Sequence, residues 1–170
     1  MARMFARTKL YNKTLAGWER ATSSVSTVKS MASMFWDSCE FNQNISNWNV
    51  SNVTNMSSMF EGACKYNEPL NNWERTGSTL EGVTNMEKMF KGAKDFNHDI
   101  SNWDVSGVTT MEEMFRKAED FDKSLKAWGE HLKTTLVTTS MFLNATAMKA
   151  KYNTLPDTPV TTQATWEGYF

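Results

Sequence analysis

The chain has 170 residues, 40% of them hydrophobic, and a formal net charge of −1 at pH 7. This length and apolar content suit one domain with its own core. The near-neutral charge argues against nucleic-acid binding, which needs a basic surface. No run approaches the roughly 18 to 20 apolar residues that cross a bilayer, so we expect no membrane span. The N-terminus lacks the apolar core of a signal peptide.

A Met-Phe dipeptide recurs along the chain and marks six repeats. The copies are Met4-Phe5, Met34-Phe35, Met59-Phe60, Met89-Phe90, Met114-Phe115 and Met141-Phe142. In five repeats a tryptophan follows in constant register: Trp18, Trp48, Trp73, Trp103 and Trp128. No copy can cover its own apolar face, so the copies should stack and bury these tryptophans and methionines. We predict one repeat domain over residues 1–155, with repeats starting near residues 1, 31, 56, 86, 111 and 138, and an extended tail over 156–170.

Two patterns inside each repeat predict its elements. The apolar side chains from Met86 to Ala93 recur at helical spacing, and Thr84 and Thr109 are predicted to cap such short helices. The spacing of Ile45, Trp48, Val50 and Val53 is typical of the short strand in a leucine-rich repeat. The predicted fold class is α/β, a leucine-rich-repeat-like solenoid of about six repeats of 25–30 residues, each with a short strand and a short helix.

Two cysteines are too few for a disulfide framework. Cys39 and Cys64 nevertheless occupy the same position in adjacent repeats. A helix there would hold the backbones about 8 to 10 Å apart, beyond disulfide reach, whereas a tighter loop would allow a bond. The sequence leaves both possibilities open.

The repeats closely resemble the BspA-like leucine-rich-repeat proteins, a family that includes the repeats of mycoplasma surface lipoproteins. The resemblance spans residues 1–145 and is clearest in two segments, FNQNISNWNVSNVTNMSSMF (41–60) and FNHDISNWDVSGVTTMEEMF (96–115). It implies an α/β leucine-rich-repeat-like fold and a protein-binding or adhesion role at the cell surface or in secreted form, with no catalytic residues to transfer. The chain is short and shows no signal peptide, lipidation cysteine or anchor. An alternative is therefore an intracellular or particle-associated structural subunit of a larger assembly or virus particle.

No constellation of residues predicts catalysis or a cofactor. His98 and His131 fall at different repeat positions without further metal ligands nearby in the sequence,. Nothing orients Cys39 against a histidine as a nucleophile and base. The acidic pair Glu112 and Glu113 lacks the spacing of a calcium loop, and no glycine-rich phosphate loop is present. We predict a non-enzymatic protein that holds no metal and no cofactor.

The predicted partner-binding face follows from strand alternation, because residues that flank an inward tryptophan should point outward. Its residues are Glu19, Asn47, Asn49, Asn72, Glu74, Asn102 and Asp104. This polar, mildly acidic row suits a protein or glycan partner better than phosphate. The second candidate is the basic first repeat, with Arg3, Arg7, Lys9 and Lys13. A neighbouring subunit could also contact the first repeat or the C-terminal tail.

Overall fold

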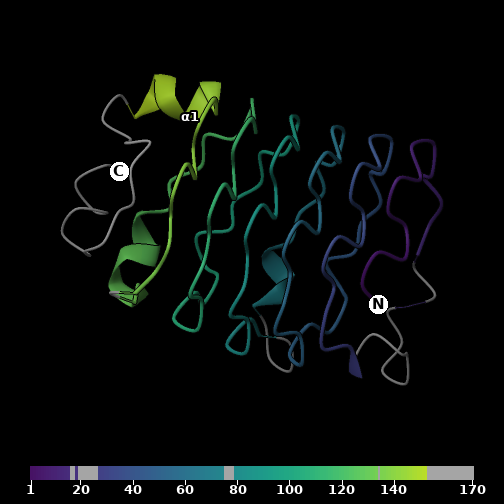
Figure 1. Cartoon of the computed structure of the whole chain (residues 1–170), viewed down its shortest axis with the longest axis horizontal. Helices are drawn as coiled ribbons and strands as arrows, with labels where there is room; N and C mark the ends of the chain where they lie inside the picture. Colours follow the sequence, from purple (N-terminus) through teal and green to yellow (C-terminus); the bar gives the residue numbers. More distant parts are fainter. Residues whose placement is uncertain (16–17, 19–26, 75–78, 134, 153–170) are drawn as a thin grey trace.

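The computed structural model describes residues 1–15, 18, 27–74, 79–133 and 135–152. The chain winds into a row of stacked coils, with the N-terminal coil at one end and α1 at the other (Figure 1). We number the coils one to six from the N-terminus, each built around its Met-Phe pair. The helical elements are η3 (Asn71–Trp73), η4 (Lys126–His131) and α1 (Thr146–Lys151). Over the described ranges, the coils pair through single parallel bridges rather than strands: Ser30 with Asn55, Asn55 with Asn85, Asn85 with Thr110 and Thr110 with Val137.

The predicted α/β solenoid of strand-plus-helix repeats is wrong. The segment 86–93, expected to be a helix, is a run of consecutive turns. Lys88 and Gly92 have φ angles of 57° and 68°, which a right-handed helix does not allow. The N–H of Lys88 donates to the carbonyl of Glu112 in the next coil at 2.8 Å, instead of to a carbonyl one helical turn back. Bonds between coils therefore replace bonds along a helix.

The same type of segment, which we call a turn run, occurs in all six coils (residues 1–7, 31–38, 56–63, 86–93, 111–118 and 138–145), and in the first five its alternate N–H groups donate to the next coil. In the second turn run, the N–H groups of Ser33 and Phe35 donate to the next coil at 2.8 and 2.9 Å, while that of Met34 closes a turn onto Met31 at 3.1 Å. An isolated two-turn helix is marginal in water. Because alternate N–H groups donate to the neighbouring coil, the backbone is hydrogen-bonded without forming a helix.

The regions around the tryptophans also contain turns where short strands were expected. The N–H of Trp48 donates to Ile45 at 3.1 Å, and that of Val53 donates to Val50 at 2.8 Å, so both bonds close local turns. The predicted helix cap at Thr84 is absent as well. Its N–H and its hydroxyl both donate to the carbonyl of Thr54 in the preceding coil, at 3.0 and 3.2 Å.

The core is a set of aromatic ladders that run along the stack. Neighbouring rings of the Phe5, Phe35, Phe60, Phe90, Phe115 and Phe142 ladder lie 5.5 to 5.7 Å apart. Trp73 stacks on Trp103 at 5.8 Å, and Trp48, Trp73 and Trp128 are fully buried. Met4 is the exception among the Met-Phe methionines, since 51% of it is exposed. Phe5, Tyr11 and Trp18 of the first coil are partly buried. In the later coils, the predicted burial of the Met-Phe pairs and tryptophans is confirmed.

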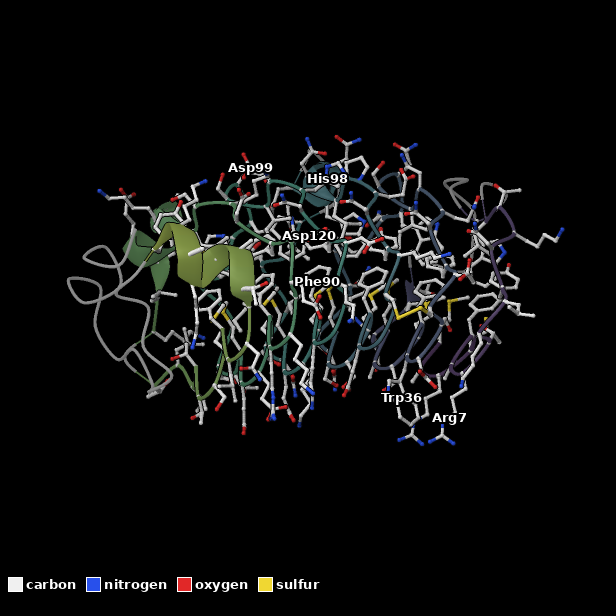
Figure 2. All side chains as sticks on the ribbon, turned by 90° about the horizontal axis from the view of Figure 1, so that it is seen from above. Arg7, Trp36, Phe90, His98, Asp99 and Asp120 are labelled. Carbon is white, nitrogen blue, oxygen red and sulfur yellow. A yellow bond between two sulfur atoms is a disulfide. The ribbon has the colours of Figure 1, made fainter. Side chains whose placement is uncertain are left out.

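Cys39 and Cys64 are joined by a disulfide between coils two and three, visible as the yellow bond in Figure 2. Their Cα atoms are 4.5 Å apart, within the usual disulfide range. The turns allow this approach, whereas two packed helices would not. The bond links adjacent coils where the backbone N–H of Lys65 already donates to the carbonyl of Cys39 at 3.1 Å.

Part of the predicted domain architecture falls outside the described residues. The extended tail over 156–170 lies there, as does Glu19 of the predicted binding face. In the described part of the chain, no helix is long and apolar enough to cross a membrane.

Candidate partner-binding site

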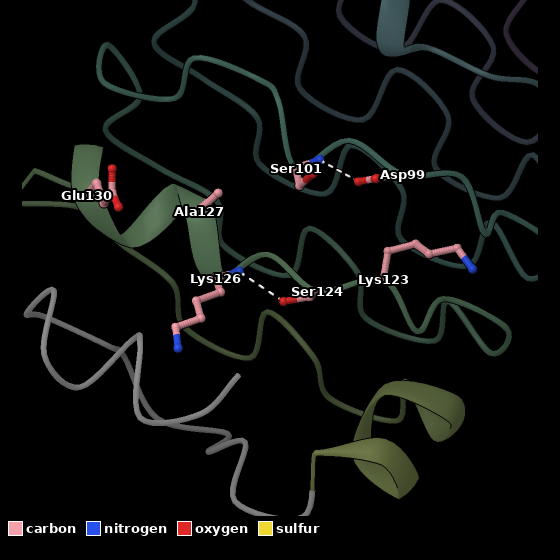
Figure 3. A pocket seen from close by; sticks show the side chains of 7 residues that line it. All are labelled: Asp99, Ser101, Lys123, Ser124, Lys126, Ala127 and Glu130. Atoms are coloured by element: carbon pink, nitrogen blue, oxygen red, sulfur yellow. Dashed lines mark hydrogen bonds between the residues drawn. The ribbon is translucent and has the colours of Figure 1, made fainter.

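A groove opens between coils four and five, beside η4 (Figure 3). It has a volume of about 530 Å³, and its lining residues are Asp99, Ser101, Lys123, Ser124, Lys126, Ala127 and Glu130. A second hollow of about 400 Å³ adjoins it. The two share Ser101, Ala127 and Glu130, and the second adds Asn102, Trp103, Asp104, Ser106 and His131. Together they form one continuous surface lined mostly by polar and charged residues, which we call the η4 groove.

The local sequence explains why the groove lies at this place. Coils two, three and four carry an asparagine immediately before the tryptophan, whereas coil five carries Ala127. Its short side chain leaves space that an asparagine would fill. The backbone also changes here, because Trp128 lies within the six-residue η4, longer than the three-residue η3 around Trp73.

Two carboxylates of the groove are fixed in place by the turns that carry them. Asp99 Oδ1 accepts the N–H of Ser101 at 2.9 Å, and Asp104 Oδ1 accepts the N–H of Ser106 at 2.9 Å. Bonds from the Ser101 N–H and hydroxyl, together with the nearby Lys123 charge, lower the pKa of Asp99. Bonds from the Ser106 hydroxyl and N–H likewise lower the pKa of Asp104. Both groups are therefore anionic at neutral pH, in orientations set by the backbone.

The other charges of the groove make it mixed rather than uniformly acidic. Lys123 lies at one end of the groove, and Lys126 and Glu130 lie at the other, on η4 (Figure 3). Lys123 pairs with Asp122 outside the groove at 3.1 Å. The N–H of Lys126 donates to the hydroxyl of Ser124 at 3.3 Å, which holds the start of η4 against the groove floor. Such a surface offers both hydrogen-bond donors and acceptors to a ligand.

Of the described residues of the predicted binding face, the structure brings Asn102 and Asp104 into this groove. Asn47 and Asn72 are exposed on earlier coils. Asn49 and Glu74 support the fold. Asn49 Oδ1 accepts the N–H and the hydroxyl of Ser51 at 3.0 and 2.7 Å, so it closes its own turn.

Glu74, also predicted to face a partner, instead caps two backbone amides. Its Oε1 accepts the N–H of Leu80 at 2.8 Å and that of Asp104 at 3.2 Å. Burial raises the pKa of Glu74, while these two bonds oppose the shift. Asn49, Glu74 and Asp104 therefore all accept backbone amides. Asn102 and Asp104 differ from the others in lining the groove, where Asn102 Nδ2 donates to the carbonyl of Asn71 at 3.1 Å.

The second predicted site, the basic first repeat, is exposed as expected: Arg3, Arg7, Lys9 and Lys13 all lie on the surface. The Arg7 guanidinium carbon lies 4.4 Å from the centroid of the Trp36 ring, and Arg3 lines a hollow that also includes Trp36 and Lys88. His98 Nε2 lies 2.9 Å from the backbone carbonyl oxygen of Asn67. Among the described residues, no three Cys, His, Asp or Glu side chains cluster to hold a metal.

Sequence reasoning missed the groove and the asparagine ladder behind it. Asn12, Asn42, Asn67 and Asn97 occupy one position in successive coils, and the Oδ1 of each accepts a backbone N–H of the following coil at 2.9 to 3.1 Å. The signal was present in the sequence, since an asparagine follows Phe41, Tyr66 and Phe96 in register. The groove had a weaker signal, the change from asparagine to Ala127.

Comparison with known proteins gives one match of high coverage. A family model described as a mycoplasma protein of unknown function, DUF285, matches residues 1–81 and again residues 76–164. No curated protein and no solved structure matches the chain. The two family matches share the Met-Phe repeats that build the stacked coils, and together they span nearly all of the sequence. The chain therefore belongs to the DUF285 family of mycoplasma proteins.

Proposed function

We propose that this chain is a non-enzymatic binding module of the adhesion type, which holds a protein or glycan partner in the η4 groove. The observation that carries the proposal is the groove itself. It presents Asp99 and Asp104, each held by its own turn, next to the exposed Asn102. Polar groups that are already fixed lose little conformational entropy when a ligand binds.

The kind of partner follows from the composition of the groove. Carboxylates, lysines, an amide and serine hydroxyls alternate around Ala127. This mixture complements a protein loop or a neutral glycan, both of which carry donors and acceptors together. It is poorly suited to a polyphosphate, because Asp99, Asp104 and Glu130 would repel it.

Two further observations support a role in adhesion. Segment 41–60 resembles the repeats of BspA-like proteins, to which a surface-attachment role belongs. The disulfide between Cys39 and Cys64 is of the kind that persists in oxidising environments such as the cell exterior. Both fit a protein that meets its partner outside the reducing interior of a cell.

The proposal is tested by site-specific photo-crosslinking in cells that make the protein. A photoreactive residue replaces Ala127 in the groove or, as a matched control, Ala150, an exposed alanine of α1 outside the groove. We expect a discrete adduct from Ala127, absent from Ala150, and its identity reports whether the partner is protein or glycan.

A charge variant then links the adduct to the groove. Asn102→Lys with Glu130→Lys should abolish the Ala127 adduct and change the thermal unfolding temperature only slightly. The pair removes one exposed hydrogen bond, from Asn102 Nδ2 to the carbonyl of Asn71, and among the described residues no hydrogen bond of the Glu130 side chain supports the fold. Equal adducts from both alanines, or an adduct that survives the double substitution, would place the partner elsewhere.

A further inference from the structure

Trp36 is the one aromatic residue at its position in the turn runs. The equivalent positions of the other coils hold small, aliphatic or charged residues: Ala6, Glu61, Lys91, Arg116 and Leu143. Trp36 is half-buried and does not belong to the buried core. In Figure 2, Trp36 and Arg7 project together from one edge of the stack, while His98 and Asp99 lie towards the opposite edge.

Arg7 is held against this tryptophan from both its ends. Its backbone N–H donates to the carbonyl of Trp36 at 2.6 Å, and its guanidinium carbon lies 4.4 Å from the ring centroid. A guanidinium that stacks on an aromatic ring keeps its in-plane N–H groups for a carboxylate. Because the contact with Trp36 already restricts the Arg7 side chain, its N–H donors are oriented before a carboxylate binds.

A hollow of about 310 Å³ continues from Trp36 along the turn runs. Its lining residues come from coils one to four: Arg3, Ser33, Trp36, Ser58, Glu61 and Lys88. Arg3, Ser33, Ser58 and Lys88 occupy the same position of successive coils, so a cation stands at each end with two hydroxyls between. Three coil spacings of about 4.8 Å place the two ends roughly 14 Å apart. We call Arg7, Trp36 and this hollow the Arg7–Trp36 platform.

Among the described residues, no carboxylate pairs with the basic side chains of residues 1–15. Seven cations of later coils form ion pairs with carboxylates: Lys65, Lys88, Lys91, Lys94, Arg116, Lys123 and Lys151. By contrast, Arg3, Arg7, Lys9 and Lys13 form no ion pair with any described residue, and residues 1–15 contain no Asp or Glu. Charge complementarity therefore favours an anionic partner at this end of the stack.

Glu61 narrows the class of anion. Glu61 lines the hollow and also pairs with Lys91 at 3.5 Å. Its carboxylate would repel a polyanion that carries a negative charge on every monomer. An extended peptide avoids this repulsion, because its backbone N–H groups can donate to Glu61 while its acidic side chains meet the cations at the two ends. At about 3.3 Å per residue, roughly four residues separate two carboxylates that reach both ends.

We propose that the Arg7–Trp36 platform binds an extended acidic segment of a partner protein, with its main carboxylate on Arg7 and Arg3 and a second near Lys88, which it shares with Glu87. This site shares no residue with the η4 groove. The inference goes beyond the proposed function of the groove, and its test is independent of the groove because it uses different variants and a synthetic ligand.

The test measures fluorescence anisotropy with a labelled peptide that carries Glu at every fourth position among Ser and Gly. The control peptide has Gln in place of each Glu. Two double variants remove the same charge from the same coil: Arg3→Ala with Arg7→Ala changes the platform, and Lys9→Ala with Lys13→Ala leaves it intact. Trp36→Ala removes only the ring beneath Arg7.

We expect the Glu peptide to bind and the Gln peptide not to bind. The Arg3 and Arg7 double variant should weaken binding by roughly tenfold or more, the Lys9 and Lys13 variant by less than about threefold, and Trp36→Ala by an intermediate factor, because it frees the guanidinium without removing it. Equal losses in the two double variants would mean that net charge alone attracts the peptide, and would overturn the proposal. A heparin fragment that binds more tightly than the peptide, with the same dependence on Arg7, would replace the acidic protein segment with an anionic glycan.

Discussion

The side-chain carbonyl of Asn67 accepts the backbone N–H of Asn97, one coil further along the chain, at 3.0 Å. Asn97 in turn accepts the N–H of Asp122 at 3.1 Å. A side chain thus does in this stack what a neighbouring strand does in a sheet: it satisfies a backbone donor of the next coil. The coils are held in register by such side-chain bonds together with the alternate backbone bonds of the turn runs.

Asn67→Ala removes one contact of this ladder and should destabilise the protein by about 1 kcal/mol. Asn67→Asp retains an acceptor oxygen and should cost less. The free energy of unfolding, measured by urea denaturation, checks both values. Equal losses for the two variants would show that the acceptor oxygen of Asn67 does not stabilise the stack.

Trp73→Ala should destabilise the stack by roughly 3 to 5 kcal/mol. Trp73 is fully buried, its ring stacks on Trp103 at 5.8 Å, and its Nε1 donates to the carbonyl of Ile45 at 3.2 Å. Leu10→Ala is the matched control, because 88% of Leu10 is exposed, and it should leave the unfolding free energy nearly unchanged. A small loss for Trp73→Ala would contradict the aromatic core.

The turn runs predict opposite effects for two substitutions at equivalent positions. Gly92 and Lys117 have φ angles of 68° and 60°, a region that costs a side chain about 1 to 2 kcal/mol. Gly92→Ala should therefore destabilise by about 1 kcal/mol, since a Cβ there meets no atom closer than 3.9 Å and only the backbone conformation opposes it. Lys117→Gly should stabilise by up to about 1 kcal/mol. Thermal unfolding measures the stability of both variants. If both substitutions change the stability in the same direction, the left-handed turns would be refuted.

Reduction of the Cys39–Cys64 disulfide should lower the free energy of unfolding by about 3 kcal/mol. It opens a loop with a sequence separation of 25, and the unfolded chain therefore gains conformational entropy. Urea denaturation with and without a reductant measures the loss. The Cys39→Ser and Cys64→Ser double variant is the control, and its stability should not respond to the reductant. If the wild-type protein shows no response either, the two cysteines are not bonded in solution.

Some features of the fold could be predicted from the sequence because they depend on burial alone. The recurrence of Phe90 and Trp103 in register identified the core, since apolar spacing reports which side chains turn inward. The backbone could not be predicted in the same way. Apolar residues three and four apart fit a short helix, but they also fit consecutive turns, and only the bonds between coils, such as Lys88 to Glu112, separate the two.

The candidate site shows the same division. Asn102 was predicted to face outward from its position beside Trp103, and it is exposed. Asn49 and Glu74 were assigned to the same face, but their side chains close turns and cap amides, which strand alternation does not reveal. The groove depends on the path of η4 relative to coil four, a relationship between segments that no local pattern contains.

The most direct test of the account is the affinity of the partner captured at Ala127 for the wild-type protein and for Ala127→Gln, which fills the groove at the position where earlier coils carry asparagine. Calorimetric titration gives both dissociation constants, and thermal unfolding confirms that the two proteins are equally folded. We expect affinity to fall by roughly tenfold or more. Unchanged affinity in an intact fold would contradict binding in the η4 groove.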